Sequence, residues 1–275
     1  MAGLDAGRVR IILTLAGDAF AGVSVHCERP DIAAALRGKP ADEAVALVPL
    51  IYALCGQAQG VAARAALAAA RGQATVAHVD ARVVAEAARE HAWKLLVDWP
   101  KQLGLAPDEA LFVRVAKAAP GTAAALATQL RSLPLFAAMT ALLAGGGGDA
   151  FLAARIAARR DELCAFLAGG TTLAGRVAAQ SLGAGRGCAT VATARGELRH
   201  EIALAGAPDE PGHRIAAYVI VAPTDRLFGP DGPLPDLLRG IQKVGAGGTA
   251  ARAVMALDPC VPWQLEMVGM DGSRA

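Results

Sequence analysis

The sequence has few cysteines and no surplus of charge. Its five cysteines, an odd number, are scattered along 275 residues, a pattern that favours free thiols over a disulfide framework. Lysine and arginine together number 27 against 25 acidic residues, which gives a formal net charge of +2. This balance creates no field strong enough to indicate nucleic acid or an anionic membrane as a partner.

A long apolar run of the kind that crosses a membrane is also missing. Hydrophobic residues make up 54% of the chain, but much of this is alanine, which favours helix and contributes little transfer free energy. The most apolar stretch, residues 132–148, contains Pro134 and ends in four glycines, whereas a spanning helix needs about 20 strongly apolar residues. The N-terminal segment lacks the order of charge, apolar core and cleavage site of a secretory signal. We therefore expect a cytoplasmic protein.

Local patterns predict a helix-rich α+β protein with small β elements. Residues 9–25 alternate around Gly17 and Asp18, which indicates a hairpin. The clearest helical patterns cover residues 41–48, 54–71 and 82–99, and the middle, 108–170, is also helical. Strand patterns follow at 189–193, 198–204 and 214–222, then a proline-rich loop at 223–235, and helix or turn at 237–241 and 247–256. Trp93 and Trp99 on the third helix are expected to be packing residues.

Two cysteines lie in motifs near opposite ends of the chain. Residues 54–70 read LCGQAQGVAARAALAAA and contain Cys55, while residues 256–268 read ALDPCVPWQLEMV and contain Cys260. Between them stand TARGEL at 193–198, with His200 just after it, and VAPTDRLFGPDGPLPDLLRG at 221–240. A lone CG or DPC is common by chance, so the signal lies in the order of the four segments.

Together these segments resemble the large subunit of [NiFe] hydrogenases. The outer two are similar to its CGxC and DPCxxCxxH motifs, and the inner two to its APRGxxxH segment and its proline–threonine loop. The second cysteine of each metal motif is replaced here by Ala58 and Trp263, and the terminal histidine position is Glu266. Around Arg29 and Pro30, where the family has an RGxE-like element, this sequence has Asp31 and Ile32 and no clear acid at the corresponding place. The motif-bearing parts span about residues 20–75 and 185–268, and the helical middle, 76–184, is shorter than in the enzymes.

This depleted ligand set is like that of the HupK and HoxV assembly proteins, which share the CGxAQ and DPC elements. The resemblance implies a single domain over residues 1–275 with a shortened large-subunit-like core. It implies a non-catalytic scaffold or chaperone that holds the Fe(CN)2(CO) unit before its transfer to the hydrogenase large subunit. The implied partners are the hydrogenase maturation chaperones and that large subunit.

The resemblance assigns a role to five residues. Cys55 and Cys260 would bind the iron, Arg195 and Thr224 would donate hydrogen bonds to the cyanides, and Pro223 would form an apolar wall on the carbonyl side. Burying cyanide without donors would cost about 2–7 kcal/mol on the scale of an unpaired polar group. Without the second cysteine of each motif a four-sulfur nickel site cannot form, so no nickel is expected.

The local sequence around both cysteines favours negative charge. Cys55 begins a helical pattern, and Asp258 and Pro259 before Cys260 are typical of an N-cap and a first-turn proline. At a helix N-terminus the exposed amides and the macrodipole lower the pKa of a thiol. We therefore expect two reactive sulfurs, each at the start of a helix.

Other interpretations of the same residues stay open. Cys55 could be core packing, Arg195 a surface residue and Thr224 a loop hydroxyl. Among the remaining cysteines, Cys27 beside His26 is a weaker candidate for a third ligand, whereas Cys164 and Cys188 are expected to be structural.

The sequence is also compatible with two other functions. The chain could be a metal-free chaperone that binds maturation partners, or a degenerate redox enzyme. The replacements at Ala58 and Trp263 disfavour the redox enzyme.

Overall fold

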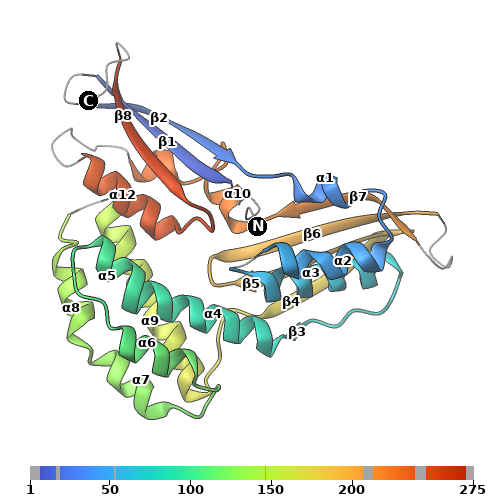
Figure 1. Cartoon of the computed structure of the whole chain (residues 1–275), viewed down its shortest axis with the longest axis horizontal. Helices are drawn as coiled ribbons and strands as arrows, with labels where there is room; N and C mark the ends of the chain where they lie inside the picture. Colours follow the sequence, from blue (N-terminus) through green and yellow to red (C-terminus); the bar gives the residue numbers. More distant parts are fainter. Residues whose placement is uncertain are drawn as a thin grey trace, which may run out of the picture.

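A computed structural model describes residues 7–16, 19–52, 54–145, 147–206, 213–238 and 246–270. Figure 1 shows two β-sheets, one above the other in the view, and a group of helices beside them. The strands are β1 (Arg8–Ala16), β2 (Ala19–Glu28), β3 (His78–Val79), β4 (Arg176–Gly183), β5 (Arg186–Thr193), β6 (Gly196–Ala205), β7 (Arg214–Val221) and β8 (Trp263–Gly269). The helices are α1 (Ile32–Leu36), α2 (Ala41–Ile51), α3 (Gly56–Ala70), α4 (Ala81–Trp93), the π-helical turn η1 (Lys94–Asp98), α5 (Trp99–Gln102), α6 (Glu109–Ala116), α7 (Ala124–Arg131), α8 (Pro134–Ala141), α9 (Gly148–Ala168), α10 (Pro223–Leu227), α11 (Leu234–Leu237) and α12 (Ala246–Leu257).

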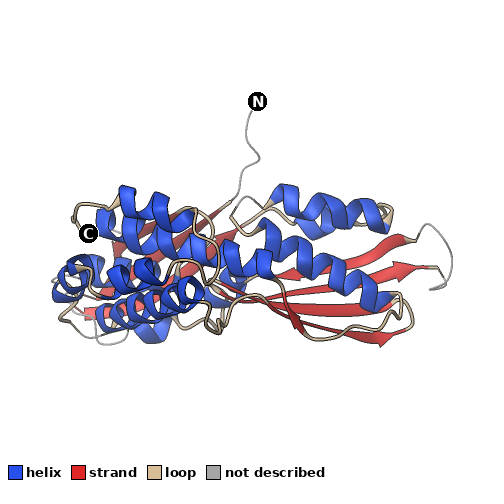
Figure 2. Cartoon of the chain, turned by 90° about the horizontal axis from the view of Figure 1, so that it is seen from below, coloured by secondary structure: helices blue, strands red, loops and turns tan. Residues whose placement is uncertain are grey.

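The larger sheet carries helix α3 on one face, and small residues bring the two close together. Its strands run β3-β4-β5-β6-β7 and all pairs are antiparallel. A Cβ at Gly187 on β5 would lie 2.2 Å from the backbone nitrogen of Ala70, so only glycine fits at this crossing. The alanines of α3, including Ala63 and Ala66, are buried against the sheet. Near the start of α3, where Cys55 lies, Ala58 and Val61 are buried with Val191 and Leu198 of the same sheet. Figure 2 shows helices lying along one side of the long strands in its right half.

The smaller sheet joins the two ends of the described chain. Its order is β2-β1-β8, with β1 antiparallel to β2 and parallel to β8. Val9 pairs with Cys27 on one side and with Trp263 on the other. The apolar face of β1 packs on Ala250, Ala253 and Val254 of α12. The DPC motif, which lies between α12 and β8, is thereby held beside the end of β2.

The helical middle is built on a helix that passes through a proline. Helix α4 continues through η1 into α5, and Trp99 is fully buried in the core of this region. A proline ring normally clashes with the carbonyl four residues earlier. Here the Leu96 carbonyl accepts a hydrogen bond from the Asp108 N–H at 2.8 Å, and the Trp99 N–H bonds five residues back to Lys94. The wider π turn therefore accommodates Pro100.

Several predicted elements are confirmed and others are wrong. The hairpin, the three N-terminal helical patterns and the three central strands are present, although the residues between β1 and β2, 17–18, lie outside the described part. The β structure is substantial and not small, because the described part of the chain forms eight strands in two sheets. Strand β4 lies in the segment predicted as helical, and β8 was not predicted. The proline-rich segment 223–235 was predicted as a loop, but it contains α10 and the start of α11. Of the helix or turn predicted at 237–241, residues 239–241 lie outside the described part of the chain.

Among the described residues, no helix has both the length and the apolar character needed to cross a membrane. Trp99 is a packing residue as predicted. Trp93 keeps 42% of its surface exposed and contacts Phe112 edge-on, with ring centroids 5.4 Å apart.

Candidate functional site

The two motif cysteines line one pocket. It lies where the start of α3, the middle of α4, the β5–β6 turn, the start of α10 and the segment after α12 meet. The empty space among its lining residues, including the solvent at its open mouth, is about 460 Å³. All five residues singled out from the sequence are part of its wall. The lining residues are Leu54, Cys55, Gln59, Val83, Glu86, Ala87, Glu90, Thr193, Ala194, Arg195, Leu198, Ala222, Pro223, Thr224 and Cys260.

Thr224 is attached directly to Cys260. Its hydroxyl accepts a hydrogen bond from the Cys260 backbone N–H at 3.1 Å and donates to the Cys260 Sγ, also at 3.1 Å. Thr224 is almost completely buried, in the first turn of α10 after Pro223 at the first helical position. A proline suits this position because its missing N–H has no partner there. The structure thus excludes the alternative interpretation of Thr224 as a simple loop hydroxyl, because its side chain is fixed against the sulfur.

The predicted helix start at Cys260 is wrong. Helix α12 ends at Leu257, and the Asp258 N–H still donates to the Val254 carbonyl at 2.9 Å. Asp258 then adopts a φ of 52°, the left-handed conformation that aspartate tolerates better than most residues. The letters D-P-C therefore mark the exit from a helix, where a proline commonly follows. Cys260 lies between α12 and β8 and receives no helix dipole from a following helix.

Cys55 does precede a helix, but its thiol is not activated. It is the N-cap of α3, as predicted. However, the Gln57 and Ala58 amides of the first turn donate to the Glu86 carboxylate at 2.8 and 3.1 Å. Burial, reinforced by the nearby Cys260, raises the pKa of the Cys55 thiol to about 12. The expected lowering of this pKa is therefore wrong, because desolvation outweighs the dipole and Glu86 occupies the amides.

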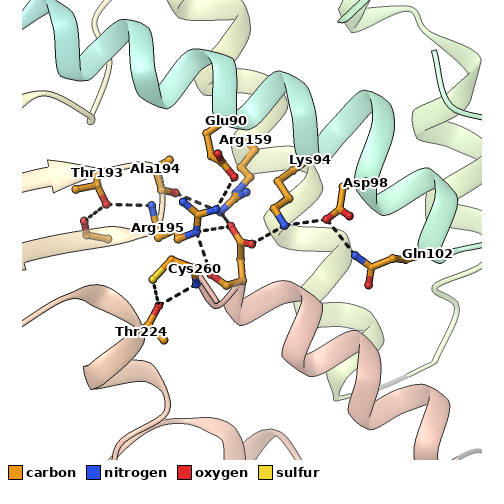
Figure 3. Close-up of polar contacts among 12 residues, drawn as sticks. Glu90, Lys94, Asp98, Gln102, Arg159, Thr193, Ala194, Arg195, Thr224 and Cys260 are labelled. Atoms are coloured by element: carbon orange, nitrogen blue, oxygen red, sulfur yellow. Dashed lines mark hydrogen bonds and ion pairs between the residues drawn. The ribbon is translucent and has the colours of Figure 1, made fainter. Parts of the chain in front are cut away.

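Arg195 is held at the pocket by carboxylates on two elements. Its Nε donates to the Asp258 carbonyl and lies 3.2 Å from the Asp258 carboxylate, and its Nη2 pairs with Glu90 on α4. Figure 3 shows this guanidinium between Glu90 and the segment that leads into Cys260. Since Arg195 is only 8% exposed, the surface interpretation is excluded. Its charge is fixed beside both sulfurs before any ligand enters.

Asp258 is the centre of a buried ion cluster that sequence reasoning missed. Its carboxylate lies 2.7 Å from Arg159 and 2.9 Å from Lys94, in addition to Arg195. These three cations hold its pKa well below the usual range, although burial alone would raise it. A signal was present in the sequence, because polar residues recur every fourth position along α4, η1 and α5. They are Glu86, Glu90, Lys94, Asp98 and Gln102.

Arg29 fixes the turn that carries Thr224. Its Nη1 lies 2.6 Å from the Asp225 carboxylate, whose other oxygen accepts the Ala222 N–H at 2.8 Å at the start of α10. Arg29 thus contributes a structural ion pair between the end of β2 and α10. This ion pair was not foreseen from the sequence.

A line of buried polar side chains connects the larger sheet to Cys55. The Tyr218 hydroxyl lies 2.8 Å from His200 Nδ1, and His200 Nε2 lies 2.8 Å from Gln59 Oε1. The Gln59 amide nitrogen then donates to the Cys55 Sγ at 3.7 Å. His200 has no exposed surface, and burial lowers its pKa to about 3, so its ring is neutral at physiological pH.

The buried His200 predicts acid sensitivity. Its pKa in the folded protein lies below the unfolded value of about 6.5, so its contribution to stability is present above that pH and is lost as pH falls towards 3. The slope is at most about 1.4 kcal/mol per pH unit. We expect the free energy of unfolding in urea to fall between pH 6.5 and 4, and to fall less steeply in His200→Phe. The exposed His78→Phe control should keep the wild-type slope; an equal slope in His200→Phe would contradict the assignment.

The remaining cysteines lie outside the pocket wall. Cys27 is partly buried against the core beneath the smaller sheet, a core that Cys260 also contacts. Cys164 is buried and donates to the Ala127 carbonyl at 3.5 Å, and Cys188 is buried in β5. Over the described ranges, no group of three or more histidine, cysteine, aspartate or glutamate side chains is arranged to hold a metal ion.

A wider groove adjoins the pocket. Leu54, Glu90, Arg195 and Cys260 line both spaces, and the groove encloses about 690 Å³ counted out to solvent. Trp263, at the position of the missing second cysteine of the DPC motif, lies in its wall. Other residues of the groove are Trp93, Lys94, Asp98, Trp99, Gln102, Met255, Asp258, Pro259, Val261 and Pro262.

The fold is shared with a [NiFe] hydrogenase. The chain is similar to a chain in the crystal structure of the NAD+-reducing [NiFe]-hydrogenase in the H2-reduced state, with a TM-score of 0.51 and 13% sequence identity. The similarity covers 88% of this chain and 92% of that one. At this identity the likeness shows the fold alone.

Sequence relatives point to hydrogenase maturation. No family model matches the chain. It is 26% identical to the hydrogenase expression/formation protein HupK of Azotobacter vinelandii over 96% of this chain and 99% of that protein. It is 41% identical to HupK of Bradyrhizobium diazoefficiens and 39% to HoxV of Cupriavidus necator, but these matches cover only 32% and 23% of those proteins. The curated homologues of the chain are therefore HupK and HoxV hydrogenase expression/formation proteins, which confirms the resemblance.

Proposed function

We propose that the chain is a non-catalytic hydrogenase maturation factor, a scaffold that holds the Fe(CN)2(CO) unit between Cys55 and Cys260 and passes it to the hydrogenase large subunit. One observation carries this proposal: two cysteines from opposite ends of the chain line one pocket, together with Arg195, Pro223 and Thr224. The names of the homologues support a role in hydrogenase expression or formation.

The charge of the pocket suits such a ligand. Iron(II) with two cyanides, a carbonyl and two thiolates carries a net charge near −2 by simple counting. Arg195 supplies a buried guanidinium at the wall; of the carboxylates that share this wall, Glu90 pairs with Arg195 and Glu86 accepts from the Gln57 and Ala58 amides. Lys94 and Arg159 lie behind Arg195 around Asp258. A guanidinium gives strong charge-assisted hydrogen bonds to an anionic acceptor. We propose that Arg195 and the Thr224 hydroxyl donate to the two cyanide nitrogens, and that the Thr224 hydroxyl turns its proton from the Cys260 Sγ to a cyanide when the unit binds.

The rest of the wall suits the carbonyl. Val83, Ala87, Leu198, Ala222 and Pro223 give the pocket an apolar side with no competing donors on their side chains. A carbonyl ligand needs no hydrogen bond, so it can face these residues without a desolvation penalty. Pro223 is rigid and begins α10, which fixes the wall relative to Thr224.

The replaced cysteines restrict the site to iron. Ala58 is completely buried in α3 and Trp263 lies in the wall of the groove, so neither supplies a sulfur where the [NiFe] enzymes have one. With two thiolates in place of four, no nickel site forms. This set of residues also gives no basis for turnover of hydrogen.

The proposed partners are the hydrogenase maturation chaperones, as donors of the iron unit, and the hydrogenase large subunit, as its acceptor. We place this exchange in the cytoplasm. All five cysteines are free, which suits a reducing compartment.

Anaerobically purified protein tests the proposal directly. We expect infrared bands of bound cyanide and carbonyl, and iron without nickel by metal analysis, because two soft thiolates and the buried cation retain the anionic unit. Protein with no iron and no bands, yet in a stable complex with a maturation partner, would show a metal-free chaperone instead. Oxidation of hydrogen by the isolated chain would show a degenerate enzyme.

A further inference from the structure

Three buried polar side chains, Gln59, His200 and Tyr218, form a continuous hydrogen-bonded line that ends at the Cys55 sulfur. Gln59 is almost completely buried and lies one turn after Cys55 on α3, with its backbone N–H donating to the Cys55 carbonyl at 2.9 Å. Its side chain bridges the Cys55 sulfur on one side and His200 on the other. Tyr218, buried on β7, completes the chain. Three elements, α3, β6 and β7, thus contribute to one line of polar groups that ends at the sulfur.

The proton positions follow from the chemistry of each group. The Gln59 Oε1 can only accept, so His200 Nε2, 2.8 Å away, must carry the ring proton. The neutral ring then has a lone pair on Nδ1, which must accept from the Tyr218 hydroxyl at 2.8 Å. With its oxygen held by His200, the amide presents its N–H groups to Cys55. Every hydrogen bond in the chain therefore points towards the sulfur.

A sulfur that binds a metal is an acceptor only. A donor aimed at it suits the metal-bound thiolate, and outer groups of this kind commonly tune metal sites. Without the iron unit, the Thr224 hydroxyl donates to the Cys260 Sγ at 3.1 Å. When its single proton turns to a cyanide, as proposed above, the Gln59 amide remains as a donor to a sulfur of the site.

We propose that Gln59 is a positioning residue that hydrogen-bonds the iron-bound Cys55 sulfur, and that His200, fixed by Tyr218, holds the Gln59 amide with its nitrogen towards that sulfur. The inference rests on the proposed function and adds to it the group that tunes one iron ligand. The hydrogen bond withdraws electron density from the thiolate, so the iron returns less density to the carbonyl. Removing the bond should strengthen donation from sulfur to iron.

Gln59→Met is the direct test. Methionine keeps a similar volume in the buried site but has no donor. We expect the carbonyl band of the loaded protein to move to lower wavenumber, and the affinity for the iron unit to fall roughly 10- to 100-fold, as is typical when an outer partner of a metal ligand is lost. His200→Phe should move the band in the same direction, because the amide is then free to turn. Gln57→Met, the same change at an exposed position on the same helix, should leave the spectrum unchanged.

A second measurement needs no variant and no iron. The nitrogen NMR shifts of the His200 ring in the purified wild-type chain should show the proton on Nε2; a proton on Nδ1 would overturn the orientation of the amide. Unshifted bands in Gln59→Met, with iron content equal to wild type, would refute this inference while leaving the scaffold proposal intact. Absence of bands from the wild-type chain would refute both.

Discussion

Cys55→Ala and Cys260→Ala chains are each expected to lose the cyanide and carbonyl infrared bands and the bound iron, while keeping the fold. A single thiolate cannot clamp the iron unit, and the structure offers no third sulfur in the pocket wall among the described residues. Both residues keep part of their surface exposed, and alanine removes only one sulfur atom from each position. The free energy of unfolding should therefore change by about 1 kcal/mol or less. Infrared spectroscopy, metal analysis and circular dichroism on the same preparations make the comparison.

Two other cysteines provide controls. Cys188→Ala removes a buried thiol from β5, outside the pocket, and should keep the bands. Cys27→Ala should keep them too, because Cys27 does not line the pocket. Unchanged bands in Cys55→Ala would remove that residue from the ligands, and loss of bands in Cys27→Ala would add a third sulfur.

Asp258→Asn is expected to lower the free energy of unfolding by about 3–5 kcal/mol, the usual cost of removing one partner from a buried ion pair. Asparagine tolerates the left-handed backbone at this position, so the change tests the charge and not the turn. Three cations, Lys94, Arg159 and Arg195, lose their shared carboxylate. Denaturant unfolding at neutral pH measures the effect.

The pH dependence gives a second readout of the same carboxylate. Its pKa in the folded chain is depressed, so its contribution to stability is present above the unfolded value of about 3.9 and is lost as the pH falls below it. Wild type should therefore lose stability below about pH 4, and Asp258→Asn should lack this part of the decline.

Asp42→Asn is the matched control. Asp42 forms a bidentate pair with Arg71 at the surface, at 2.7 and 2.9 Å. An exposed pair of this kind contributes about 0–1 kcal/mol. Adding Arg159→Met to Asp258→Asn should cost less than the sum of the two changes, since it removes one of the uncompensated cations. A loss in Asp258→Asn no greater than in Asp42→Asn would show that the cluster does not stabilise the fold.

Local patterns predicted the elements whose periodicity is strong. The alanine-rich pattern after Cys55 gave α3 within two residues at each end, and alternation gave the β1–β2 hairpin. Strand β4 was missed because RVAAQSLG contains alanines that suit a helix equally well. Strand β8 was missed because its pairing with β1 joins segments from opposite ends of the chain, which no local window contains.

The site residues were predicted through motif order and not through local chemistry. Nothing near Cys55 in the sequence indicates that it shares a pocket with Cys260; the resemblance supplied that pairing. The DPC letters suit either a helix start or a helix exit, and only tertiary packing decides between them. The role of Asp258 as the centre of an ion cluster was missed because its partners Lys94 and Arg159 come from distant elements, η1 and α9.

The parallel pairing of β8 with β1 also has a consequence for the kinetics of folding. Cys260 is held between α12 and β8, and β8 is anchored by β1, with Val9 paired to Trp263. Because contacts between segments so far apart in the sequence close a large loop, they form slowly. We therefore expect the pocket wall around Cys260 to form late in folding, after the helices that depend on local contacts.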